Sequence, residues 1–165
     1  MGPPKMKRLL RILFLVPVAL VVNLLITIVF VYFVLVCDIY INTERLSRAN
    51  PPLNVYCENI AHSSQFTKGP VIFRIDKGTL VFRLAPYFRD GIVGYAPFFI
   101  FPHHRTVILS DEVLKRGSLD VIVAHELGHI QGGLKHIGSA KEMEQYANNF
   151  AIQVLKTLEP QEPQK

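Results

Sequence analysis

Two histidines and a glutamate are spaced so that they can form a hydrolytic metal site. The run HELGH at residues 125–129 puts His125 and His129 four residues apart. In a helix, residues at that spacing share a face, with Cβ atoms about 5–6 Å apart, so both imidazoles can bind one Zn²⁺. Glu126 would then lie beside the ion, where its carboxylate can take a proton from a metal-bound water. The run therefore predicts one zinc ion per chain, with Glu126 as the catalytic general base.

The residues before this run favour a buried helix over a polar loop. Residues 121–124 are Val, Ile, Val and Ala, so the histidines and the glutamate would be buried together. Burying these polar groups costs free energy unless a metal or hydrogen-bond partners compensate for the lost water. The alternative is an amphipathic helix whose two histidines find such partners elsewhere in the fold. The spacing favours the metal site.

A zinc site of this kind needs a third protein ligand, and two residues are candidates. Glu144 lies on the next expected helix, and Asn148, four residues later, shares its face and can orient one of the histidines. His136 is the other candidate. It comes one residue after the position that the metzincin spacing H-E-x-x-H-x-x-G-x-x-H requires, where Lys135 stands. The pattern favours Glu144 as the ligand and keeps His136 as the alternative.

Two segments together resemble a known group of peptidases. VAHELGHI at residues 123–130, followed by EQYANNFA at residues 144–151, resembles the gluzincin pattern HExxH then ExxA(D/N)xxA. It is most similar to the HtpX and CaaX-prenyl-endopeptidase family, in which Asp is more usual at the position of Asn148, and next to the ImmA/IrrE-like metallopeptidases. The resemblance covers about residues 105–158. It implies a zincin-like fold and the following site residues: His125, Glu126, His129 and Glu144.

Short strands are expected before the predicted helices. Residues 71–75 and 79–84 flank Asp76-Lys77-Gly78, a turn whose glycine permits positive φ, and this pattern predicts a hairpin. Further apolar segments predict strands at residues 92–95, 98–101 and 105–109. Together they indicate an antiparallel sheet of about three to five strands. An edge strand such as 105–109 could bind an extended peptide by strand addition.

Two longer helices follow the strands. Ser118 can cap a helix over residues 119–130, which the glycine pair after it would close. Ser139 and Glu142 fit a capping box that begins a second helix, extending to about Leu158. The first of these helices carries the HELGH run, and the second carries the favoured third ligand.

Residues 12–37 contain no charged side chain and are expected to form a transmembrane anchor. A helix of this length extends about 39 Å, enough to cross a bilayer core of about 30 Å. A cleaved signal sequence is the alternative, but its apolar region usually has about 7–15 residues and ends at a small-residue site. Four basic residues within 1–11 favour a cytoplasmic N-terminus, with the rest of this single-pass protein outside the cytoplasm.

The remaining charge is nearly balanced. Of the 18 Lys and Arg residues, four precede residue 12, whereas all 13 Asp and Glu residues follow residue 37. The net charge of +5 therefore comes largely from the N-terminal segment. Nucleic-acid binding needs a concentrated basic face, so no nucleic-acid partner is expected.

The domain organisation follows from composition. Residues 38–69 are rich in Asn, Ser and Pro and are expected to be a connecting region with one short helix near residues 38–47. This region would join the anchor to a zinc metallopeptidase domain at residues 70–158. Residues 159–165 are expected to form a disordered tail. Cys37 and Cys57 can pair if the domain is exported, or remain two separate thiols.

The sequence as a whole predicts an α+β protein, with one N-terminal transmembrane helix followed by a small zincin-like domain. That domain would contain an antiparallel sheet and the HExxH active-site helix. The expected function is that of a membrane-anchored zinc endopeptidase, with a protein or peptide substrate and a lipid bilayer as partners, suited to processing or quality control of membrane or envelope proteins. His103 or His104 could stabilise the oxyanion. The alternative is a non-catalytic, membrane-anchored zinc-binding protein with a vestigial protease site.

Overall fold

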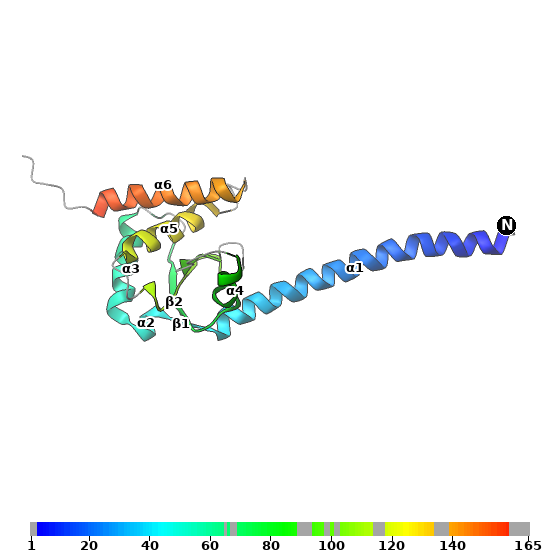
Figure 1. Cartoon of the computed structure of the whole chain (residues 1–165), viewed down its shortest axis with the longest axis horizontal. Helices are drawn as coiled ribbons and strands as arrows, with labels where there is room; N and C mark the ends of the chain where they lie inside the picture. The colour runs from blue at the N-terminus through cyan, green and yellow to red at the C-terminus, as the bar shows by residue number, and fades with distance from the viewer. Residues whose placement is uncertain are drawn as a thin grey trace, which may run out of the picture.

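A computed structural model describes residues 3–64, 66, 69–88, 94–97, 100, 103–113, 118–133 and 139–158. The protein is α+β, as expected (Figure 1). Its elements in chain order are α1 (Pro3–Ile41), β1 (Thr43–Arg45), α2 (Leu46–Ala49), α3 (Pro51–Ser63), β2 (Ile72–Asp76), α4 (Leu80–Phe88), β3 (Gly94–Tyr95), β4 (Thr106–Leu109), α5 (Leu119–Gly132) and α6 (Ala140–Leu158).

The sheet has four strands in the order β1-β2-β4-β3 and is mixed. β1 pairs antiparallel with β2, and β3 pairs antiparallel with β4, but β2 and β4 run parallel. The prediction of an antiparallel sheet is therefore wrong. The reason is that the chain leaves β2 through α4 and returns along β3 before it enters β4, so no tight turn joins the two central strands.

The predicted hairpin at residues 71–84 is also wrong, because its second half forms α4. The Asp76 side chain accepts hydrogen bonds from the backbone N–H groups of Gly78 (2.9 Å) and Thr79 (2.8 Å). Asp38, at the end of α1, accepts one from the N–H of Leu80 at 2.8 Å. These bonds satisfy backbone donors at the start of α4, which the helix itself leaves unpaired. Gly78 has the positive φ, 111°, that its place in the turn suggested.

The segment 38–69 is more than a connection with one short helix. It contains β1, α2 and the 13-residue α3. Asn50 caps α3 by accepting a hydrogen bond from the Leu53 N–H at 3.2 Å, and a proline occupies the first helical turn, where its missing N–H costs nothing. Cys57 and Ile60 on α3 belong to the main core. Both cysteines are free.

The remaining predicted elements are confirmed in part. β3 and β4 lie inside the predicted strands 92–95 and 105–109. The predicted strand 98–101 lies outside the described residues except for Ile100, which is not in a strand. α5 and α6 lie where they were predicted, although the Ser118 side chain makes no capping hydrogen bond.

The capping box of α6 is confirmed. The Ser139 N–H donates to Glu142 Oε2 at 2.6 Å, and the Glu142 N–H donates to Ser139 Oγ at 3.3 Å. These two hydrogen bonds satisfy two backbone N–H groups that the start of α6 would otherwise leave unpaired.

α5 lies between α6 and the sheet (Figure 1). The main core is formed between these layers by apolar residues from the strands and both helices: Phe73, Ile75, Val107, Leu109, Val123, Leu127, Ala151 and Val154. Ile108 of β4 points to the other face of the sheet and joins a second cluster with Ile39 and Ile100. The end of α1 therefore covers the sheet face opposite α5.

The rest of α1 projects away from the domain (Figure 1). By length and composition its segment Leu13–Ile41 can cross a membrane, and none of its most apolar window is buried in the described structure. Side chains at residues 13–33 are exposed, whereas Leu35 and Val36 pack on the second cluster. The last turns of α1 therefore pack as part of the domain.

Candidate metal centre

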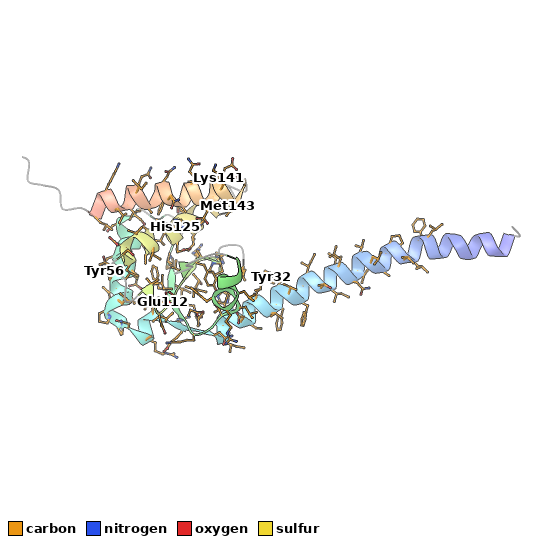
Figure 2. The ribbon with its side chains drawn as sticks, in the orientation of Figure 1. Tyr32, Tyr56, Glu112, His125, Lys141 and Met143 are labelled. Carbon is orange, nitrogen blue, oxygen red and sulfur yellow. The ribbon has the colours of Figure 1, made fainter. Side chains whose placement is uncertain are left out.

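A close approach of α5 to α6 positions the predicted ligands. Gly128 lies at the contact: a Cβ placed there would be 2.8 Å from Ala147 Cα and 3.0 Å from Ala147 O. Only a residue without a side chain lets the two backbones come this near. Figure 2 shows His125 on α5, below the first turns of α6, where Lys141 and Met143 lie. Gly128 was not singled out from the sequence, although it lies inside the HELGH run.

Donor atoms from three residues converge between the two helices. Nε2 of His125 lies 3.1 Å from Nε2 of His129 and 3.4 Å from Oε2 of Glu144. Nε2 of His129 lies 3.7 Å from Oε1 of Glu144. The two distances to Glu144 involve different carboxylate oxygens. One donor atom from each of the three residues lies within 4.8 Å of the other two, so His125, His129 and Glu144 could hold a metal ion.

Asn148 orients the first histidine. Its Oδ1 lies 3.0 Å from Nδ1 of His125. An amide oxygen only accepts hydrogen bonds, so Nδ1 of His125 is the donor here, and Nε2 is the ring atom that faces Glu144 and His129. Asn148 lies one helical turn after Glu144 on α6.

Glu126 is buried, with 6% of its surface exposed, and lies outside the three-residue cluster. Its Cγ would be 3.5 Å from a Cβ at Gly94, so this side chain lies against β3. The same imagined Cβ would be 3.2 Å from Cγ2 of Ile122 on α5. The strand can run this close to α5 because residue 94 is a glycine.

β3 is the sheet edge nearest to this site. It is the last strand in the order, paired with β4 on one side. β4 itself pairs with β2 and β3, so the interpretation of residues 105–109 as an edge strand is wrong. Among the described residues, the edge strand beside Glu126 is β3.

The other histidine candidates are not brought to the cluster. His103 is buried and packs near the backbone of Val36 in α1. A turn at residues 104–105, with a hydrogen bond from the Thr106 N–H to the His103 carbonyl, follows it, and neither His103 nor His104 belongs to the group of His125, His129 and Glu144. Burial lowers the pKa of His103, and a backbone hydrogen bond with Val36 partly opposes this. His136, the alternative ligand, lies outside the described residues.

No family model, curated protein or solved structure matches this chain. The gluzincin resemblance therefore stays a prediction from two motifs.

Proposed function

We propose that this chain is a membrane-anchored zinc metallopeptidase that hydrolyses peptide bonds in proteins. One observation carries the proposal: two imidazoles and a carboxylate converge closely enough to bind one metal ion. Two nitrogen donors and one oxygen donor form the ligand set of many catalytic zinc sites, which keep a fourth position for water or substrate. A structural zinc site has no need of the buried Glu126 next to the first ligand.

When zinc is bound, it polarises the scissile carbonyl and makes a water molecule more acidic. Glu126 would take the proton of the attacking water and deliver it to the leaving amine. Asn148 keeps the His125 ring in the tautomer that leaves Nε2 free to bind. The edge of β3 would hold the substrate backbone in an extended conformation next to Glu126.

The membrane position is supported by α1. Its exposed segment, residues 13–33, is about 31 Å long, which matches a bilayer core of about 30 Å. The basic residues before it favour a cytoplasmic N-terminus. The domain would then lie on the other side of the membrane, directly at its surface.

The test uses the full chain in detergent, with denatured casein as substrate. We expect one zinc per chain and cleavage that a chelator stops and added zinc restores. Glu126→Gln should bind zinc as the wild type does and lose about 10²- to 10⁴-fold in rate, the usual contribution of a general base. Asp120→Asn on the same helix is the matched control and should change neither property.

Two outcomes would count against the proposal. Cleavage by Glu126→Gln at the wild-type rate would exclude the assigned general base. Stoichiometric zinc without turnover on any of a panel of unfolded proteins would favour the alternative, a non-catalytic zinc-binding membrane protein.

A further inference from the structure

A single amide lies at the centre of the apolar part of α1. Among residues 13–33 the polar side chains are Asn23, Thr27 and Tyr32. Asn23 is midway along this segment, so in a bilayer it would lie near the midplane, about 15 Å from either surface. Tyr32, by contrast, lies near the domain end, where an aromatic ring with a polar tip suits the membrane interface (Figure 2).

The Asn23 side chain is exposed and makes no hydrogen bond among the described residues. Thr27 donates its hydroxyl to the Asn23 backbone carbonyl at 2.8 Å, so Thr27 is satisfied within its own helix. The amide of Asn23 has two donors and an acceptor, and hydrocarbon supplies partners for none of them. An unsatisfied amide at this depth is costly, and a polar group from another helix removes the cost.

The face around Asn23 permits close approach. Ala19, Asn23 and Thr27 recur every four residues and so form one stripe, whereas most other residues of the segment are large and apolar. Small residues on one stripe let two membrane helices come near enough for side chains to hydrogen-bond across the interface.

We propose that α1 pairs in the membrane with α1 of a second copy of this chain, through hydrogen bonds between the two Asn23 amides. Copies inserted in the same direction put Asn23 at the same depth. An amide both donates and accepts, so two of them are self-complementary about a twofold axis along the membrane normal. A different membrane protein would need a polar group at that same depth. The inference depends on the membrane position proposed for α1 but not on peptidase activity.

The experiment measures energy transfer between donor- and acceptor-labelled full-length chains in phosphatidylcholine vesicles, as the protein-to-lipid ratio is varied. We expect wild-type chains to associate reversibly. Asn23→Leu should weaken the association about 5- to 30-fold, the factor that corresponds to one interhelical hydrogen bond of about 1–2 kcal/mol. Asn23→Gln, which keeps an amide, should retain most of it. Leu25→Ala, on a different face of α1, is the control and should associate as the wild type does.

Several results would overturn the proposal. Wild-type chains that stay monomeric over the whole range of lipid ratios would do so, as would a chain that alkaline carbonate extracts from the vesicles. Equal association of wild type and Asn23→Leu would show that Asn23 is not the contact. Loss of association in Leu25→Ala but not in Asn23→Leu would assign the interface to another face.

Discussion

Replacing Gly128 with alanine should separate α5 from α6 and disturb the metal site without touching any ligand. The added Cβ would lie 2.8 Å from Ala147 Cα, 3.0 Å from Ala147 O and 3.1 Å from Phe150 Cβ. Ordinary carbon contacts begin at about 3.5 Å, so α6 must retreat by about 0.7 Å at Ala147. Two of the three close atoms belong to backbone, which cannot rotate away as a flexible side chain could.

These contacts determine the free-energy cost of the substitution. Overpacking of this kind usually costs about 1–3 kcal/mol, and three simultaneous short contacts favour the upper end. Alanine returns about 1 kcal/mol because it favours the helix over glycine. We therefore expect the free energy of unfolding to fall by about 2 kcal/mol. Glu144, one turn before Ala147, would move with α6 by more than the roughly 0.2 Å that a metal–ligand bond tolerates. Zinc affinity should fall about 10- to 100-fold, as when an outer contact of a ligand is lost.

Two measurements keep these effects apart. Urea unfolding in excess chelator reports the stability of the metal-free chain, and competition with a chromophoric chelator reports zinc affinity. Val121→Ala, at an exposed position of α5, is the control and should stay within about 0.5 kcal/mol of wild type. Because the clash is with backbone, adding Ala147→Gly should not rescue Gly128→Ala. A Gly128→Ala chain with unchanged stability and unchanged zinc affinity would refute the argument that this contact positions Glu144.

Three further predictions concern single side chains. Asn148→Leu should weaken zinc binding about 10- to 100-fold, because the His125 ring loses the acceptor that orients it, and Asn148→Asp should restore most of it; equal affinities in a chelator competition would contradict this. Burial lowers the pKa of His103 in the folded chain. As the pH falls below about 6.5, this histidine is therefore protonated more readily in the unfolded chain, and the free energy of unfolding decreases. Urea unfolding between pH 8 and 5 should show a smaller loss for His103→Gln, and an identical pH dependence would exclude this contribution. Burial raises the pKa of Cys57 to about 12, so iodoacetamide at pH 8 should label it only after unfolding; rapid labelling of the folded chain, seen by mass spectrometry, would contradict its place in the core.

The grouping of His125, His129 and Glu144 was predictable because it depends on local sequence patterns. His125, Glu126 and His129 lie on one helix, whose periodicity alone puts the two imidazoles together. Glu144 and Asn148 follow on the next helix, begun by the capping box at Ser139. What the sequence analysis missed is the part that Gly128 plays in the close approach of the two helices, because a glycine inside an HExxH run carries no mark of a second role in helix packing.

The fold was less predictable, in part because the conformation of one segment depends on a contact with a residue far away in the sequence. Residues 79–84 have the composition of a strand, yet α4 forms where Asp38, 42 residues away, accepts the first helical N–H. Residues 38–69 were expected to be mainly a connection because they are rich in Asn, Ser and Pro, but a proline in the first turn is also how α3 begins. At α4 the contact with the distant Asp38 favours the helix, whereas α3 begins at a local cap formed by Asn50.

The junction between α1 and the sheet has a mechanical consequence. One residue, Asn42, separates α1 from β1, and Thr43 Oγ1 donates to the Ile39 carbonyl at 2.5 Å while the Arg74 guanidinium donates to Thr43. These contacts connect the domain rigidly to α1, without a flexible linker. In the membrane position proposed for α1, a bilayer thinner than the apolar length of the helix would tilt α1. The domain would rotate together with the helix. Bilayer thickness would then set the angle at which the metal site faces the surface.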